Sequence, residues 1–397
     1  MSLMSMATHL FMLFVCIELA SLSSYILVAF HKESKIGGEA GMKYFIVGSV
    51  ASAVGIYGMS LLYLWSGDLS LDALAIKWSE SESVDPLAGI AVGLMLVAFG
   101  FKVGAAPFHL AAPDAYSGAS SPVAGLLATA SKAMGFVALM RILVSVTMPV
   151  EGEAFWYTAI AVIAVVTMTW GNLAALTSSN PKRMLAYSSV SHAGYMLAGL
   201  AAIGSGLGSE EAIELVLTAI VFHLAVLVIF KFGAFLVLSL LETEGRSHRL
   251  EDLHGLARRE PLVAGSMFLF MLSLAGVPPL SGFLSKFLMI NGIVNISAGT
   301  GASDATSVID WLTSVEPVFW LAFAIVINSA LSMFYYLRIG LVMFFEEPED
   351  SRTLKDALSL KLAIVACAIL TLLVGIGPLS DSLLEMVAEA INSFVSN

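Results

Sequence analysis

The stretch "LMLVAFGFKVGAAPFHL", residues 94–110, combines an apolar membrane-type segment with groups that a bilayer disfavours. Lys102 lies inside the apolar run, and "GAAP", residues 104–107, follows it. A lysine at the centre of a spanning helix costs about 2.5–3.5 kcal/mol on insertion scales. A proline removes a backbone donor and interrupts a helix. The stretch therefore predicts a broken membrane helix that carries a buried charge.

The composition of the whole chain agrees with a membrane environment. The 397 residues are 58% hydrophobic and 12% charged, and soluble domains carry about twice that charged fraction. Apolar blocks of about 20 residues alternate with short polar loops, and such blocks suit helices, which satisfy their own backbone hydrogen bonds in lipid. We predict an all-α polytopic membrane protein that forms a single membrane domain over residues 1–397.

The apolar blocks predict ten membrane spans. The eighth would run about 54 Å as a straight helix and contains "GVPPLSG", residues 276–282, so we expect it to be discontinuous at Pro278 and Pro279. The third is expected to break at Pro107. The tail beyond residue 378 looks amphipathic and interfacial. The predicted spans are 9–30, 43–66, 87–109, 122–147, 155–177, 183–203, 213–241, 262–297, 317–345 and 359–378.

The charges of the loops alternate from one side of the membrane to the other. One set of loops is rich in Lys and Arg, and the other set is acidic with Lys77 as its only basic residue. Because basic loops stay in the cytoplasm, we predict both termini outside a bacterial plasma (inner) membrane. The basic loops are 31–42, 178–182, 242–261 and 346–358, and the acidic ones are 67–86, 148–154, 204–212 and 298–316.

Several classes of site lack sequence support. Cys16 and Cys367 lie in separate apolar segments and form no CxxC motif, which argues against an iron–sulfur or zinc site. The chain has no dinucleotide-binding or phosphate-binding glycine loop, and it has no basic stripe of the kind that binds nucleic acid. We predict no metal, no cofactor in this chain and no nucleic-acid partner.

Ionisable side chains at membrane depth are the candidate functional groups. Burial disfavours their charged forms, while a neighbouring opposite charge favours them, so such groups can load and release protons. A structural ion pair or a snorkelling lysine is the alternative for any one of them, and Lys43 could be only an interfacial anchor. His223 has no partner readable from the sequence, and a helix–helix hydrogen bond is the simpler expectation. The other candidates are Glu18, Lys102, Lys132, His192, Lys231 and Lys286.

Several long motifs resemble one family. The segment "GFKVGAAPFHLAAPDAYSGASSPVAGLLATASK" (100–132) is similar to the FK…PFH…PDxYxGA…SK signature of the antiporter-like membrane subunits of the proton-pumping NADH–quinone oxidoreductase, respiratory complex I, in the form of subunit N. "NPKRMLAYSSVSHAGYML" (180–197) and "LSLAGVPPLSGFLSKF" (272–287) resemble two further blocks of that subunit, and "CIELASL" and "GMKYF" match two short elements. The resemblance covers nearly the whole chain.

The resemblance implies an antiporter-like fold with two inverted repeats, each with a broken helix. It implies proton translocation coupled to quinone reduction elsewhere in the complex, with neighbouring antiporter-like subunits as partners and with NADH and quinone used only by the whole complex. Carried over by position, Glu18 would pair with Lys102, Lys132 would be the central relay, and Lys286 would pass protons outward. His192 matches the helix histidine between the central groups, while His109 and Lys43 match positions of less certain role.

Two departures from the family pattern bear on these expectations. Family members have about four more N-terminal helices than the chain as given, so we expect 9–147 to be an incomplete first repeat, 155–345 the second, and 359–397 a terminal span and tail. Lys231 stands where the family has an uncharged residue, and it would be either an added relay group or a side chain against lipid-facing carbonyls.

Two rival functions share much of this pattern. A subunit of a multi-chain cation/proton antiporter or of a membrane-bound hydrogenase would also have the lysines and the broken helices. A truncated, non-pumping scaffold paralogue is the other alternative. The scaffold gains little support, because a scaffold could replace its buried charges by apolar residues with a gain in stability.

Overall fold

A computed structural model describes residues 2–31, 33–245, 249–298, 316–348 and 357–395. Helices make up almost all of this described part, apart from an isolated bridge between His9 and Ser70. The chain divides into two compact units, Met1–Trp156 and Tyr157–Asn397. The all-helical class predicted from the sequence is confirmed.

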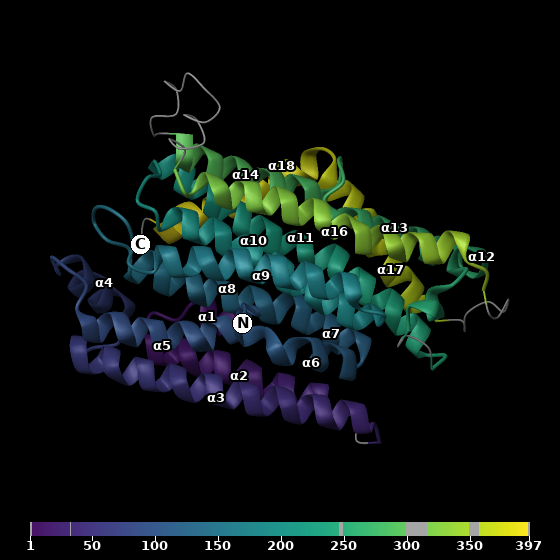
Figure 1. Ribbon diagram of the computed structural model, residues 1–397, viewed down its shortest axis with the longest axis horizontal. Helices are drawn as coiled ribbons and strands as arrows, with labels where there is room; N and C mark the ends of the chain where they lie inside the picture. Colours follow the sequence, from purple (N-terminus) through teal and green to yellow (C-terminus); the bar gives the residue numbers. More distant parts are fainter. Residues whose placement is uncertain (1, 32, 246–248, 299–315, 349–356, 396–397) are drawn as a thin grey trace. The chain divides into compact units, whose positions relative to one another are not determined.

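The first unit contains a layer in which α2, α3 and α5 lie side by side (Figure 1). Local signals define its helix ends: Ser34 accepts the Gly37 N–H to start α3, and Asp85 accepts the Leu87 N–H to start α5, as N-caps do. The elements are α1 (Ser2–Ser5), α2 (Leu10–Val28), α3 (Lys35–Ser66), α4 (Leu71–Ser79), α5 (Pro86–Val103), the 3₁₀ turn Phe108–Ala111, α6 (Ala112–Gly118), α7 (Ser121–Leu126) and α8 (Lys132–Met140), with π-helical segments at Leu127–Ser131 and Arg141–Val146.

The second unit is arranged around a helix that is polar yet buried. In α10, every residue except Arg183 and Tyr187 is buried, and α9, α11, α14 and α16 of the same unit pack against this helix. Its serines and its histidine must therefore find partners inside the protein. The elements are α9 (Tyr157–Thr177), α10 (Pro181–Ile203), α11 (Glu210–Glu242), the 3₁₀ turn Leu250–Leu253, α12 (Leu256–Arg259), α13 (Pro261–Ala275), α14 (Ser281–Ala298), α16 (Phe319–Phe345), α17 (Leu358–Gly375) and α18 (Pro378–Val395).

The helices occupy the predicted spans with several corrections. Eight helical segments of the described chain are long and apolar enough to cross a membrane, while α10 and the pair α13 and α14 fill the other two predicted spans. The count of ten thus stays an expectation. Segments predicted as loops are partly helical: α3 begins at Lys35, because the Ser34 cap starts it early, and α4 lies within 67–86. Most of the predicted loops 298–316 and 346–358 falls outside the described residues.

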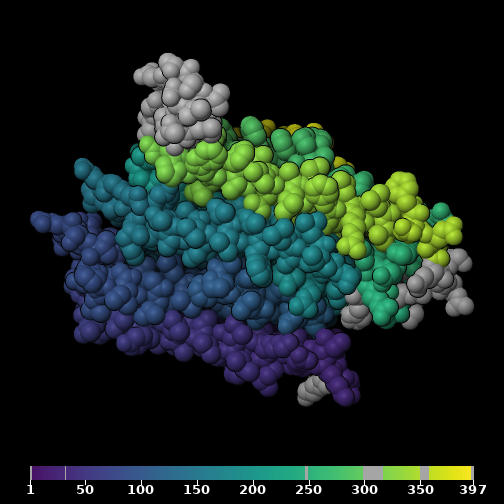
Figure 2. Space-filling view, viewed as in Figure 1, coloured from purple at the N-terminus to yellow at the C-terminus, as the bar shows by residue number. Residues whose placement is uncertain are grey.

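Large apolar side chains face outward, as lipid contact requires. Helix α16, yellow-green in Figure 2, forms part of the viewed surface, and its exposed side chains include Phe323, Phe334 and Leu341. The terminal helix α18 buries Val387 and Ile391 and packs against α11 and α17. The predicted amphipathic tail is thus a helix with one face on the second unit.

Candidate functional site

Two helices break in the same way, one in each unit. At the end of α5, Gly104 adopts the left-handed conformation (φ 76°), and the Ala105 N–H bonds to the Gly100 carbonyl at 2.8 Å. At the end of α13, Gly276 does the same (φ 84°), and the Val277 N–H bonds to the Leu272 carbonyl at 3.0 Å. Both ends are Schellman motifs, which favour glycine at this position because it has no Cβ.

A buried lysine ammonium lies beside each of these glycines. A Cβ placed on Gly104 would lie 3.8 Å from Lys132 Nζ, and one on Gly276 would lie 3.3 Å from Lys286 Nζ. Lys132 begins α8 directly after a π-helical segment, a distortion that is frequent at functional sites. Both lysines are nearly inaccessible, at 3% and 4% exposed. The sequence did not predict the π segment.

Glu18 and Lys102 line one small cavity in the first unit, together with Ser21 and Ser52. They form no direct ion pair in the described structure: Ser52 Oγ donates to Glu18 Oε1 at 2.6 Å, and Lys102 Nζ has no hydrogen-bond partner among the described residues. A buried ammonium without a partner is costly, and Glu18 is the carboxylate that lines the same cavity. The pairing that the resemblance implies is thus not a direct hydrogen bond, and the two side chains share the lining of one cavity.

The other two expected groups of the first unit lie apart from this cavity. Lys43 lies in the third turn of α3, not at its start, and pairs with Glu39 at 2.7 Å and with Asp114 of α6 at 3.2 Å. It is half exposed, so these pairs contribute little to stability. His109 is buried in the 3₁₀ turn that follows the α5 break.

The second unit holds a continuous chain of side-chain hydrogen bonds. Its first half links three residues: Lys231 Nζ of α11 to Ser188 Oγ of α10 at 3.0 Å, and Ser188 Oγ to Tyr336 Oη of α16 at 2.7 Å. The second half links Tyr336 to His192 Nε2 at 3.2 Å, His192 Nδ1 to His223 Nε2 at 2.9 Å, and His223 Nδ1 to Ser285 Oγ of α14 at 2.8 Å.

This hydrogen-bond chain has one consistent polarity. The Lys231 ammonium can only donate, so Ser188 accepts from it and donates its own O–H to Tyr336. Tyr336 then donates to Nε2 of His192, and each neutral imidazole in turn accepts at one nitrogen and donates at the other. Ser285 ends the chain by donating to the Gly282 carbonyl at 3.1 Å. From Ser188 to Ser285 every member both accepts and donates, so a proton released by Lys231 can pass along this segment without moving any backbone.

Lys286 comes directly after Ser285, the last member of that chain, and its ammonium has hydrogen-bond acceptors of its own. Its Nζ donates to the carbonyls of Leu274 and Ala275 at 2.9 and 3.1 Å and to Ser329 Oγ at 3.0 Å. The two carbonyls belong to the last residues of α13, where the helix leaves them without intrahelical partners. The helix break thus provides the oxygen atoms that solvate the ammonium.

The structure resolves what the sequence left open for two residues. Lys231 is fully buried and bonds a hydroxyl inside the unit, so it does not lie against lipid-facing carbonyls. His223 makes the expected helix–helix hydrogen bonds, and it makes them with relay members. Sequence reasoning missed Ser188 and Tyr336, although Ser188, His192 and Tyr195 follow the i, i+4, i+7 spacing of one helix face.

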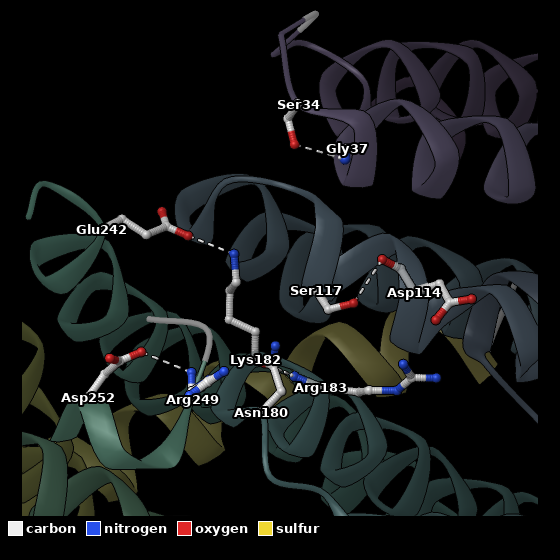
Figure 3. A network of polar contacts seen from close by, with 10 residues as sticks. All are labelled: Ser34, Gly37, Asp114, Ser117, Asn180, Lys182, Arg183, Glu242, Arg249 and Asp252. Carbon is white, nitrogen blue, oxygen red and sulfur yellow. Dashed lines mark hydrogen bonds and ion pairs between the residues drawn. The ribbon is translucent and has the colours of Figure 1, made fainter. Parts of the chain in front are cut away.

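A second polar cluster joins the N-terminal end of α10 to the C-terminal end of α11. Lys182 Nζ lies 2.7 Å from Glu242 Oε1, and the lysine side chain is only 2% exposed (Figure 3). Nearby, Asn180 caps α10 by accepting the Arg183 N–H at 3.1 Å. This pair joins the two helices that carry most of the relay.

Comparison with known proteins places the chain in a family. Residues 7–309 match the family described as "NADH:quinone oxidoreductase/Mrp antiporter, TM". The chain belongs to this family. Two curated relatives named NADH-quinone oxidoreductase subunit N come from Heliobacterium modesticaldum and Rubrobacter xylanophilus. The first is 38% identical over 96% of this chain and 74% of the relative, and the second is 39% identical over 94% and 72%.

Solved structures show the same fold. A chain of respiratory complex I from Thermus thermophilus, solved with bound aureothin, has a TM-score of 0.73 and 34% identity, with 94% of this chain and 74% of that chain covered. A chain of the Mrp complex from a Dietzia species has a TM-score of 0.81 at 26% identity, with 98% and 72% covered. Both belong to membrane complexes of several subunits, and the family's membrane subunits work with other subunits.

Proposed function

We propose that this chain is the N-type membrane subunit of a bacterial proton-translocating NADH–quinone oxidoreductase. Protons cross through Glu18 and the buried groups Lys102, Lys132, His192 and Lys286, with Lys231 as an added member. Quinone is reduced in another subunit, and this chain binds no redox group; NADH and quinone serve the whole complex. The chain lies in the plasma membrane with both termini outside, and 9–147 and 155–345 are its two repeats.

The observation that carries this proposal is the hydrogen-bond chain from Lys231 to Ser285. Lys231 can release a proton into this chain, and each of the following members can accept a proton on one side and release one on the other. A transferred proton leaves the hydrogen bonds with the opposite polarity, and rotation of the hydroxyls and exchange of imidazole tautomers restore the starting state. Such a chain needs no net movement of helices, which suits a subunit without its own energy source.

The first unit supplies the charge that regulates the path. Glu18 faces Lys102 across the small cavity, so a change in the charge of either group alters the stability of the other. Lys132 lies beside the break that follows Lys102. Moving a proton against a membrane potential costs about 2.3 kcal/mol per 100 mV, and quinone chemistry elsewhere in the complex provides this free energy.

A subunit of a cation/proton antiporter is less well supported. The relatives from Heliobacterium modesticaldum and Rubrobacter xylanophilus carry the subunit N name at 38% and 39% identity, whereas the Mrp chain shares 26%. A non-pumping scaffold is also disfavoured, since it would have no use for a consistently polarised relay.

Replacing Tyr336 by Phe tests the relay directly. Tyr336→Phe removes one hydroxyl from the middle of the chain and keeps the ring, so we expect proton pumping by the assembled complex in sealed vesicles to fall at least about tenfold. Tyr187, also on α10, is half-buried. Tyr187→Phe is therefore the control, and we expect it to leave pumping unchanged. Wild-type pumping in Tyr336→Phe would show that protons do not use this chain.

A further inference from the structure

The ring of Tyr195 lies against the Lys286 ammonium. Lys286 Nζ is 5.3 Å from the centroid of the Tyr195 ring, and a cation within about 6 Å of an aromatic face is attracted by its negative quadrupole. The attraction is strongest where water is excluded, and Lys286 and Tyr195 are 4% and 1% exposed. Lys286 also forms no ion pair with any carboxylate in the described part of the chain. The Lys286 charge is therefore stabilised by the Tyr195 ring in addition to the carbonyls of Leu274 and Ala275 and the hydroxyl of Ser329.

The same ring contacts the other protonatable group of α10. Tyr195 and His192 meet edge to face with ring centroids 5.5 Å apart, because the two residues are three positions apart on one helix face. Tyr195 thus lies between the relay histidine and the lysine at the helix break. Two ring contacts, His192 with Tyr195 and Tyr195 with the Lys286 ammonium, thus connect the relay to the lysine at the helix break.

Two asparagines hold the Tyr195 ring in place. Asn172 Nδ2 of α9 donates to Tyr195 Oη at 3.2 Å, and Asn172 Oδ1 accepts from Tyr335 Oη of α16 at 3.0 Å. Asn172 also donates to the Asn328 carbonyl at 2.9 Å. Asn172 is fully buried, and a buried amide with its bonds satisfied fixes the groups around it. The phenol end of Tyr195 is thereby anchored from α9 and α16, while its face is left for the lysine.

We propose that Tyr195 is a positioning residue of the proton path, whose anchored aromatic face stabilises the Lys286 ammonium at the α13–α14 break. The hydroxyl serves to orient the ring, and the π face acts on the charge. The proposal rests on the proton path described above, and it assigns to Tyr195 a role that neither the relay nor the helix break supplies.

Fluorination of the ring separates its electrostatic role from its shape. Tyr195→Phe keeps the face and is expected to retain at least about half of the pumping rate of the assembled complex. Phenylalanine bearing one, two and then three fluorine atoms at position 195 weakens the quadrupole stepwise with little change in size. We expect pumping to fall with each fluorine, by about threefold to tenfold at three. Tyr195→Leu should lower the pumping rate as far as three fluorines do. Tyr187→Leu, two turns earlier on α10, should leave the pumping rate unchanged.

The possible results distinguish this inference from the proposed function. If Lys286→Met abolishes pumping and the fluorine series is flat, Tyr195 does not act on the ammonium, and the inference fails while the path stands. If Lys286→Met pumps normally, the path through Lys286 is wrong, and the role of Tyr195 fails with it. Stepwise loss across the series, with normal assembly of the complex, supports the inference, since a purely structural role depends on size and not on the quadrupole.

Discussion

At the scale of single residues, Lys231 is the side chain whose importance the structure changes most. In the sequence Lys231 is a charged residue within an apolar segment. In the fold it is the hydrogen-bond donor at one end of the relay. Lys231 is fully buried and donates to Ser188, and such a bond matters because an uncompensated buried charge is strongly destabilising.

Replacing Lys231 by Met tests this assignment. Lys231→Met keeps most of the side-chain volume but removes the donor, so we expect pumping by the assembled complex to fall at least about tenfold while the protein still assembles. Lys35→Met, at the exposed start of α3, is the control. Pumping of Lys231→Met that matched the control would remove Lys231 from the path.

Two lysine pairs differ in burial and should differ in their contribution to stability. Lys182→Met removes the buried ammonium from its pair with Glu242, and we expect it to lower the free energy of unfolding by about 2 kcal/mol. This is less than for a wholly buried pair because Glu242 is 22% exposed. Lys43→Met should cost less than about 1 kcal/mol, since that lysine is half exposed. Thermal unfolding of both variants in detergent measures the difference, and equal effects would contradict the importance given to burial.

At the scale of the elements, the broken helices depend on their glycines. Gly276→Ala would force a left-handed conformation on a residue with a Cβ and would place that Cβ 3.2 Å from Lys286 Cδ. We expect loss of stability of about 1–2 kcal/mol and impaired pumping. Gly265→Ala, in the same helix, meets no atom within 4 Å of its Cβ and is the matched control. A Gly276→Ala protein as stable and active as Gly265→Ala would refute the close fit at the break.

The sequence predicts the elements better than it predicts the site. The spans follow from apolar runs of membrane length, and the two discontinuities occur where glycine and proline cluster, at 104–107 and 276–279. The π segment before Lys132 has no such local signal. The early start of α3 depends on one capping serine, which the hydropathy pattern does not register.

The relay illustrates why a site is harder to predict than a span. His192 and Lys286 are unusual residues in apolar segments, so each is a candidate by itself. Ser188, Tyr336 and Tyr195 are ordinary in membrane helices, and only the packing of α10 against α11, α14 and α16 gives them partners. The placement of Glu18 and Lys102 on one cavity likewise depends on how α2 and α5 each pack against α3. The family resemblance implied the pairing, and it could not show that the two side chains share a cavity.

At the scale of the whole molecule, both units use the same device. In each, a glycine in the left-handed conformation ends a helix inside an apolar segment, and a lysine ammonium is buried beside it. Carbonyl groups freed by the break solvate the ammonium in the second unit. A protein that only needed to pack would not keep two such sites, since buried charges lower stability unless they are fully compensated.

Proton pumping by the assembled complex with each of these two lysines replaced tests the account most directly. The measurement is the rate of proton translocation into sealed vesicles during NADH-driven quinone reduction for Lys132→Met and Lys286→Met, with Lys35→Met as the control. The account predicts that both replacements lower proton translocation at least about tenfold while the complex assembles and the control stays normal. Normal rates and a normal number of protons per electron in both variants would contradict it.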